Sequence, residues 1–159
     1  MIIRPLAPDD VPALARLMAG DPLWQRYGVT EESAARRLCE GFAAGATIAG
    51  ATIAVAEIAG EPAGFVWYVE RGAFNRSGYI MLIGVQGDAR GAGVGRALMQ
   101  HAEAALFVQA ADIFLLVSDF NTAAQAFYGR LGYEHVGTIP DYVVPGISEL
   151  IFRKRNVVL

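Results

Sequence analysis

The sequence is poor in the residues that form disulfides and metal sites, with one cysteine and two histidines in 159 residues. A single cysteine, Cys39, excludes an internal disulfide, and His101 and His135 have no second histidine, cysteine or carboxylate at the spacing of a metal site. We therefore predict no metal. Cys39 lies in the middle of a predicted helix, where we expect a buried apolar residue and not an acyl carrier.

Charges and long apolar runs are scarce too. Charged residues make up 18% of the chain, the net charge is −3, and the basic run at 153–155 comes only near the end, which argues against a nucleic acid partner. The longest uncharged stretch, residues 41–56, is shorter than a membrane span, and the first residues lack the pattern of a signal peptide. We expect a cytoplasmic protein that does not bind membranes.

The remaining composition is typical of one globular domain. Hydrophobic residues make up 54% of the chain, and a chain of this size buries roughly two thirds of its unfolded surface. We predict a single domain over residues 1–159. The pentapeptide GATIA occurs twice in succession, at 45–49 and 50–54. So short a repeat does not indicate a repeat architecture.

Apolar periodicity and turn residues predict the order strand, two helices, three antiparallel strands, helix, strand, helix and two strands. Residues 52–58 and 63–69 are expected to form a hairpin whose turn is the GEP at 60–62. The second of these strands and the stretches 80–83 and 113–117 are bulky on both faces. Such strands are typical of a sheet covered by helices on both sides, so the fold class is mixed α/β.

The segment between the first two helices carries two aromatic residues. Residues 22–28 are expected to form a loop, after which Thr30 caps a second helix that ends near Ala44. The loop contains Trp24 and Tyr27. The sequence leaves open whether they form a local cluster under the loop or a wall of a substrate pocket.

The most informative stretch is residues 80–101, IMLIGVQGDARGAGVGRALMQH. An apolar strand leads into a loop with three alternate glycines, and a helix follows. The first N–H groups of a helix have no intrahelical partner and carry a partial positive charge, and two arginines flank the loop. We predict a phosphate or pyrophosphate site there. Its residues are Arg90, Gly91, Ala92, Gly93, Val94, Gly95 and Arg96.

Other interpretations of this loop are weaker. No Lys-Ser/Thr pair follows the glycines, so the loop is not a P-loop. The G-x-G-x-G spacing also differs from the G-x-G-x-x-G of dinucleotide-binding folds. Asp112 and Asp119 still leave the dinucleotide alternative open, since either fits the acid that binds the ribose, and a turn without a ligand is the other alternative.

A second stretch, residues 121–133, predicts a helix after an apolar strand, with Gly132 in the position of a left-handed C-cap. Asn121 and Tyr128 are seven residues apart, which places them within about 20° of one helix face and about 10 Å apart along it. One ligand can therefore touch both. Taken alone, Asn121 also fits a helix cap and Tyr128 a core aromatic residue.

Together the two stretches resemble a known family. The motif Arg90-x-x-Gly93-x-Gly95 after an apolar strand resembles the acyl-CoA signature of the GNAT superfamily of N-acetyltransferases. The block N-x-x-A-x-x-F-Y-x-x-L-G-Y at 121–133 resembles the second conserved block of that superfamily and follows at the expected distance. The order of elements agrees over about residues 2–154. The family usually has a proline where this chain has the QGD of 86–88, which affects loop stiffness more than chemistry.

The resemblance implies a mixed, mostly antiparallel central sheet of about seven strands, with helices on both faces and the fourth and fifth strands splayed apart. Acetyl-CoA would lie in the gap, with its pantetheine paired to the backbone near Ile83 and Val85 and its pyrophosphate on the glycine-rich loop. Gly84 would allow a bulge that turns a backbone N–H into an oxyanion donor. Asn121 and Phe127 are expected to belong to the same cofactor site.

The resemblance also implies direct transfer of the acetyl group to a primary amine. Tyr128 would be the catalytic acid that protonates the departing thiolate. Many relatives place a glutamate early in the fourth strand, where this chain has the SGY of 77–79. The base therefore stays open among Glu70, Asp119 and Asp141. The alternative is a regulatory module that binds CoA without transferring the acetyl group.

The acceptor is open among a small amine, a peptide N-terminus and a lysine. A net negative charge and several aromatic residues fit a cationic acceptor. These aromatic residues are Trp24, Tyr27, Trp67, Tyr79 and Tyr142. We expect the second helix, the hairpin and the loop at 138–147 to form the pocket. Strand edges near the C-terminus leave a homodimer open.

Overall fold

Seven strands pair into one sheet in the computed structural model, which describes residues 1–44 and 50–157. The strands are β1 (Ile2–Pro5), β2 (Ala51–Ile58), β3 (Glu61–Ala73), β4 (Ser77–Val85), β5 (Asp112–Ser118), β6 (Glu134–Ile139) and β7 (Glu149–Arg155). The helices are η1 (Pro8–Asp10), α1 (Val11–Gly20), α2 (Pro22–Gln25), α3 (Glu31–Ala44), η2 (Gly87–Ala89), α4 (Val94–Leu106) and α5 (Thr122–Arg130). The first GATIA copy, at 45–49, lies outside the described residues.

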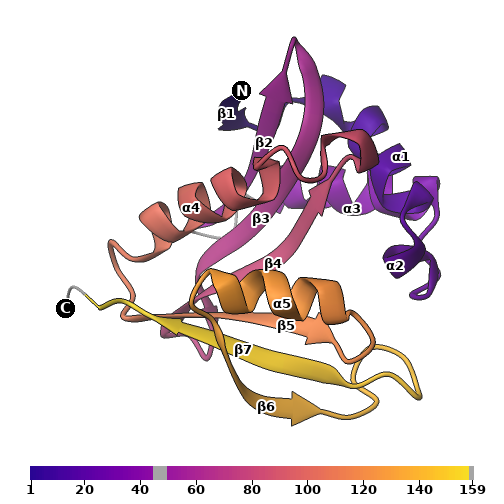
Figure 1. Ribbon diagram of the computed structural model, residues 1–159. Helices are drawn as coiled ribbons and strands as arrows, with labels where there is room; N and C mark the ends of the chain where they lie inside the picture. Colours follow the sequence, from indigo (N-terminus) through magenta and orange to yellow (C-terminus); the bar gives the residue numbers. More distant parts are fainter. Residues whose placement is uncertain (45–49, 158–159) are drawn as a thin grey trace.

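The strand order is β1-β2-β3-β4-β5-β7-β6. Among the described residues, β4 and β5 are the one parallel pair, and the other neighbours are antiparallel. Figure 1 shows β4 and β5 diverging from their paired ends. The predicted fold class is confirmed, because the resemblance implied a mixed, mostly antiparallel sheet of about seven strands whose fourth and fifth strands splay apart.

Helices cover both faces of this sheet (Figure 1). α4 packs on one face of β2, β3 and β4, and α1 and α3 pack on the other. Along β2, Ala54 and Ala56 belong to the core under α4, whereas Ile53 and Val55 belong to the core under α1 and α3. Side chains of a strand alternate between faces, so a strand between two cores is apolar throughout. The prediction of strands buried on both faces is confirmed.

The β2–β3 hairpin forms as predicted, but its turn lies elsewhere. Ile58 pairs with Glu61, so the turn consists of Ala59 and Gly60, with φ of 53° and 86°. Two consecutive positive φ angles are typical of the two-residue hairpin turn that matches strand twist. The predicted turn at 60–62 was wrong because the turn begins at Ala59, a non-glycine residue in the left-handed region that the GEP pattern does not include.

β4 contains a bulge at Met81, and not at Gly84 where the bulge was predicted. Trp67 pairs with Leu82 and Tyr68 pairs with Ile80, which leaves Met81 as the extra residue. Met81 and Leu82 consequently both pack toward the core under α1 and α3. A bulge breaks the alternation of a strand in this way.

Gly84 is not the bulge that was predicted. It pairs in register with Phe65. A Cβ at Gly84 would lie 2.6 Å from Cη2 of Trp24 and 3.0 Å from Cδ2 of Leu17. Glycine is therefore required because the side chains of α1 and α2 approach the backbone closely. The oxyanion donor predicted at Gly84 depended on a bulge there, and that bulge is absent from the register of β3 and β4 at this residue.

A short helix, α2, occupies part of the predicted loop 22–28. Asp21 caps it, because Leu23 N–H donates to Asp21 Oδ1 at 2.8 Å. A helix of four residues leaves no periodic signal in a sequence, which explains why the prediction missed it. Thr30 caps α3 as predicted, since Ser33 N–H donates to Thr30 Oγ1 at 3.1 Å.

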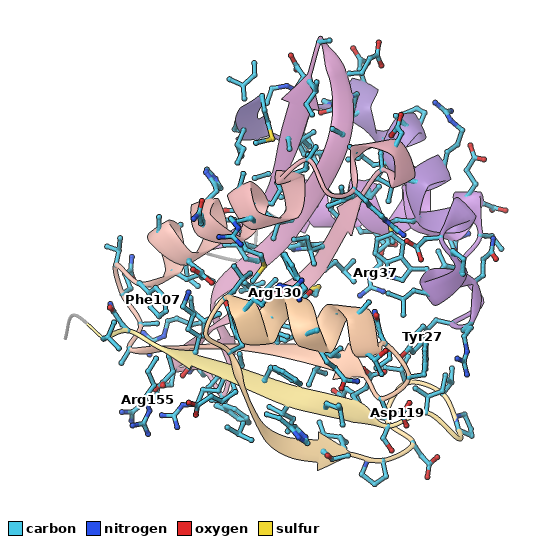
Figure 2. All side chains as sticks on the ribbon, in the orientation of Figure 1. Tyr27, Arg37, Phe107, Asp119, Arg130 and Arg155 are labelled. Atoms are coloured by element: carbon cyan, nitrogen blue, oxygen red, sulfur yellow. The ribbon has the colours of Figure 1, made fainter. Side chains whose placement is uncertain are left out.

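A side-chain cap fixes the start of α5, and a glycine in the left-handed region follows its end. Asn121 is the N-cap, with its Oδ1 accepting from Ala124 N–H at 3.1 Å, and Gly132 follows the helix with φ of 89°. The turn before α5 carries Asp119 (Figure 2), whose Oδ2 accepts from Ser148 N–H at 3.0 Å. This last bond ties the turn to the residue that precedes β7.

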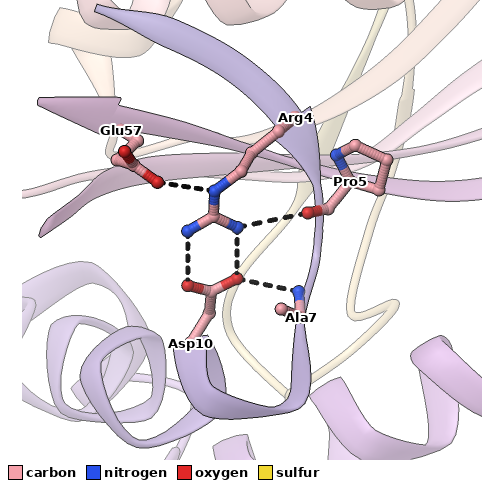
Figure 3. Close-up of polar contacts among 5 residues, drawn as sticks. All are labelled: Arg4, Pro5, Ala7, Asp10 and Glu57. Carbon is pink, nitrogen blue, oxygen red and sulfur yellow. Dashed lines mark hydrogen bonds and ion pairs between the residues drawn. The ribbon is translucent and has the colours of Figure 1, made fainter. Parts of the chain in front are cut away.

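Three charged residues tie the N-terminal strand to its neighbours (Figure 3). Arg4 Nη1 and Nη2 donate to the two carboxylate oxygens of Asp10 at 2.7 and 2.8 Å, and Arg4 Nε donates to Glu57 at 2.6 Å. Ala7 N–H also donates to Asp10, at 2.8 Å. Because Asp10 lies in η1 and Glu57 in β2, Arg4 joins three elements, and its hydrogen bonds hold the pKa of Asp10 below the ordinary value.

Two further observations concern the surface. Cys39 is exposed, so the prediction of a buried cysteine was wrong. Ala34, Leu38 and Gly41 are buried on one face of α3, and a residue one position after Leu38 points about 100° away from that face. No helix among the described residues has the length and apolarity needed to cross a bilayer.

Candidate active site

The candidate site opens where β4 and β5 separate. The two strands pair at Gly78 with Ile113, Tyr79 with Phe114 and Ile80 with Leu115, and the rest of β4 has no partner on that side within the described residues. Two cavities lie there, of about 560 and 490 Å³. Six residues line both cavities: Leu23, Trp24, Ile83, Asn121, Ala124 and Tyr128. The cavities therefore meet at the splay.

The first cavity contains nearly all the residues predicted to bind the cofactor, and we call it the loop cavity. Its predicted lining residues are Ile83, Gly84, Val85, Arg90, Gly91, Gly93, Val94, Gly95, Arg96, Asn121 and Phe127. Ala92 is the exception. It lies on the exposed side of the loop, and its N–H donates to Ala89 O at 3.3 Å, so this amide is already engaged and does not face the cavity.

The backbone at the start of α4 presents free donors to the loop cavity. Gly93 is the N-cap, with φ of 83°, and the first intrahelical hydrogen bond runs from Ala97 N–H to Gly93 O at 3.0 Å. The N–H groups of Val94, Gly95 and Arg96 precede that bond and have no helical acceptor. Together with the helix dipole, they form a site for an anion.

Three arginines add full positive charges to the loop cavity. Arg96 is exposed, and Arg90 forms an ion pair with Asp21. The third, Arg130, was not predicted, although it lies three residues after Phe127 on the same face of α5. Figure 2 shows Arg130 at the end of α5. That spacing is the signal by which the sequence identifies it.

Tyr128 lies between the two cavities. Its residue is 8% exposed, and its ring packs edge-on against Phe127 and Tyr133, with centroids 5.2 and 5.9 Å away. Burial raises the pKa of the phenol. The hydroxyl therefore stays protonated at neutral pH and is available as a donor. Asn121 also lines both cavities, and the contact of one ligand with both residues stays a prediction.

The second cavity has aromatic walls, and we call it the aromatic cavity. Of the five aromatic residues predicted to contact an acceptor, four line it: Trp24, Tyr27, Tyr79 and Tyr142. Trp67 does not, because it is buried in the core, where a Cβ at Gly41 would lie 2.4 Å from its Cη2. The β2–β3 hairpin contributes no described lining residue. Helix α3 contributes Arg37, which Figure 2 shows in the space between α3 and α5.

A buried carboxylate lies in the wall of the aromatic cavity. Glu149 is 5% exposed, and its Oε1 accepts a hydrogen bond from the hydroxyl of Tyr27, which is also hydrogen-bonded to Ser118 Oγ. Ser118 and Glu149 are cross-strand partners of β5 and β7. Burial and the bond to Glu149 raise the pKa of Tyr27 to about 12. Sequence reasoning missed Glu149, because only the register of β7 against β5 brings it to this wall.

The three carboxylates predicted as candidate bases lie outside both cavities. Asp119 accepts the hydrogen bond from Ser148, and Asp141 accepts one from Gly146 N–H at 2.7 Å, so both stabilise turns. Glu70 lies beside Gly50, because a Cβ added at Gly50 would be 2.7 Å from the Cβ of Glu70. Among residues 1–44 and 50–157, no three His, Cys, Asp or Glu side chains gather as a metal site would require.

Comparison with known proteins places this geometry in a family. The sequence model of the Acetyltransferase (GNAT) family matches residues 18–133, a range that contains both motifs. Blasticidin-S acetyltransferase from Streptomyces morookaense is 37% identical over 77 residues, which are 48% of this chain and 56% of that protein. The chain thus matches little more than half the length of this curated relative.

Solved structures share the fold. Ribosomal-protein-alanine N-acetyltransferase from Brucella melitensis superposes with a TM-score of 0.78 at 21% identity, over 98% of this chain and 100% of that one. Nourseothricin acetyltransferase superposes with a TM-score of 0.62 at 28% identity, over 67% of this chain and 66% of that one. The first likeness covers nearly the whole fold, and the second covers two thirds of it.

Proposed function

Because the chain belongs to the GNAT acetyltransferase family, we propose that it transfers the acetyl group of acetyl-CoA directly to a primary amine. The observation that carries the proposal is the loop cavity. It brings the glycine-rich loop, the unpaired edge of β4 and Tyr128 to one place, although they come from separate parts of the sequence. An N-acetyltransferase needs these groups around one thioester.

The chain's own residues fit acetyl-CoA. The free N–H groups at the start of α4 and the side chains of Arg90, Arg96 and Arg130 would hold phosphate oxygens. Beyond Ile80 the β4 edge that faces β5 has no strand partner in the described part of the chain, and its backbone would pair with the amides of the pantetheine.

Acetyl-CoA supplies an activated acyl group, and the protein supplies position and protons. Tyr128 lies where the two cavities meet and would give its phenol proton to the departing sulfur. The aromatic cavity would hold the amine on the other side of the thioester. Its volume of about 490 Å³ is in the range of small-molecule sites.

Isothermal titration of the purified chain with acetyl-CoA tests the proposal, with NAD and ATP as controls. We expect micromolar binding of acetyl-CoA alone, followed by thiol release when amines are added. Blasticidin S belongs in the first amine panel, because a relative carries that name. Binding without thiol release from any amine would favour the regulatory alternative. Binding of NAD without acetyl-CoA would favour the dinucleotide alternative.

Three further expectations accompany this proposal. We propose that residues 1–159 act as a single domain, since one sheet runs through the described residues. The single cysteine fits a cytoplasmic location. A homodimer, if it forms, would use β6, the edge strand at the C-terminal end of the sheet. Fractionation and sedimentation test the last two.

A further inference from the structure

Glu149 is a buried acid with no positively charged partner among residues 1–44 and 50–157. The only polar contact of its side chain among the described residues is the hydrogen bond from Tyr27 to Oε1. The ion pairs of the described chain join other carboxylates to arginine or lysine, and none includes Glu149. Burial of a carboxylate is costly unless a cation or several donors compensate it. This wall of the aromatic cavity therefore suits a cation brought by a ligand.

The groups that face Glu149 leave the role of cation to the ligand. Tyr27 comes from the segment between α2 and α3, Ser118 from the end of β5, and Tyr79 from β4. Arg37 of α3 lines the same cavity, but no ion pair of the described residues joins it to Glu149. Asp119 adds negative charge near Tyr27. Apart from Arg37 these groups are neutral or acidic, so their sum attracts a cation to the carboxylate.

The remaining wall indicates the body of that ligand. Trp24, Tyr27, Tyr79 and Tyr142 line the cavity together with aliphatic side chains. Aromatic walls stack on flat rings and also attract an ammonium group. A cavity of about 490 Å³ has space for one ring with a short amino side chain.

We propose that Glu149 binds the ammonium group of the acceptor and takes its proton, and that the acceptor is a small primary amine that carries an aromatic ring. This inference rests on the proposed N-acetyltransferase function and names its acceptor class and its base. It moves the base from Glu70, Asp119 and Asp141 to a residue that lines the cavity.

The protons and electrons of the step balance. Glu149 takes one proton from the ammonium group, and the nitrogen lone pair then forms the bond to the thioester carbon. When the carbon–sulfur bond breaks, its electron pair leaves with sulfur, and Tyr128 gives sulfur a proton. The new amide nitrogen loses its remaining extra proton to the tyrosinate, which restores Tyr128, and Glu149 returns its proton to water. The products are the acetylated amine, CoA thiol and one proton.

The test compares Glu149→Gln with the wild type, with tyramine as the ring-bearing amine and putrescine as an amine without a ring. Glutamine keeps an oxygen that can accept the bond from Tyr27, so the wall is preserved. We expect the wild type to have a higher kcat/KM for tyramine than for putrescine. We expect Glu149→Gln to lower kcat/KM for tyramine about 100-fold at pH 7. The loss should shrink as the pH approaches about 10, because the amine then deprotonates without a base.

Two controls separate a catalytic role from a structural one. Glu134→Gln changes an exposed glutamate on β6 and should leave kcat/KM unchanged. Acetyl-CoA affinity and the melting temperature should be the same in Glu149→Gln as in the wild type. If Glu149→Gln does not fold, Tyr27→Phe removes the group that positions the carboxylate, and we expect it to raise KM for tyramine with little change in acetyl-CoA affinity.

Each outcome decides between the two levels of the argument. A wild type that binds no acetyl-CoA overturns the proposed function itself. The acceptor class is overturned if the wild type binds acetyl-CoA but has the same kcat/KM for putrescine as for tyramine. It is also overturned if that enzyme acetylates neither amine. A folded Glu149→Gln enzyme with a kcat/KM loss that is absent, or equal at every pH, overturns Glu149 as the base while the acetyltransferase function stands.

Discussion

Substitution of Asp10 by asparagine tests the charged cluster that joins β1, η1 and β2. The change removes the charge that receives two hydrogen bonds from Arg4, at 2.7 and 2.8 Å, and keeps an oxygen for Ala7 N–H. A hydrogen bond to a charged group contributes about 1.5–3 kcal/mol. The Arg4 side chain is 30% exposed and keeps its bond to Glu57, so we expect the lower part of that range, about 2 kcal/mol.

The expected loss is large enough to measure. For a chain of this length, about 2 kcal/mol corresponds to a fall in Tm of about 4 to 8 °C. Urea unfolding at pH 7 should show a lower midpoint with an unchanged slope. Asp9→Asn is the matched control, because Asp9 is the exposed neighbour of Asp10 in the same short helix. We expect it to change stability by less than about 0.5 kcal/mol.

The effect should also depend on pH. Hydrogen bonds from Arg4 lower the pKa of Asp10 in the folded state, so the unfolded chain takes up a proton first as the pH falls. The stabilisation is therefore complete above the unfolded pKa of about 3.9 and is lost below it, as the pH falls toward the folded pKa. The difference between wild type and Asp10→Asn should be constant from pH 7 to 5 and shrink below pH 4. A difference that is constant down to pH 3 would refute the assignment of the lowered pKa to Asp10.

Three substitutions test the site. Tyr128→Phe should lower kcat about 100-fold and leave acetyl-CoA affinity nearly intact; unchanged turnover would remove Tyr128 from the mechanism. Gly93→Val should abolish acetyl-CoA binding in titrations, because a branched side chain at φ of 83° distorts the start of α4; a folded variant that still binds would contradict the phosphate site. Gly84→Ala should cost about 1–3 kcal/mol in urea unfolding, because its Cβ would meet Trp24 at 2.6 Å; wild-type stability would show that α2 yields freely.

The sequence predicted those parts of the site that local patterns encode. The glycine-rich loop leads directly into α4, and Asn121 and Tyr128 have a fixed spacing along α5. Their placement within each element therefore followed from helix geometry. The same holds for the strands, whose apolar runs lie between two cores. Periodicity within an element is visible in a single chain because it does not depend on which elements become neighbours.

The missed parts depend on tertiary pairing. Glu149 reaches the aromatic cavity because β7 pairs with β5 in a register that places it opposite Ser118. The requirement for glycine at Gly84 comes from Trp24, which is distant in sequence. Cys39 was assigned to the wrong face of α3 because the sequence does not show which face of the helix meets the sheet, and Cys39 points away from the face that carries Ala34 and Leu38. Each error concerns a tertiary contact that is not visible in the sequence.

The short parallel ladder between β4 and β5 has a consequence for folding. β2, β3 and β4 are joined by tight connections, so their pairing closes short loops, whereas β4 and β5 meet only after α4 has crossed over the sheet. Loop closure costs more entropy as loops lengthen, and this pairing holds just three residue pairs. We expect the meander of β2 to β4 to form first and the β4–β5 ladder to form late. The opening between the strands would then be completed at the end of folding, and amide hydrogen exchange should be fastest along its two edges.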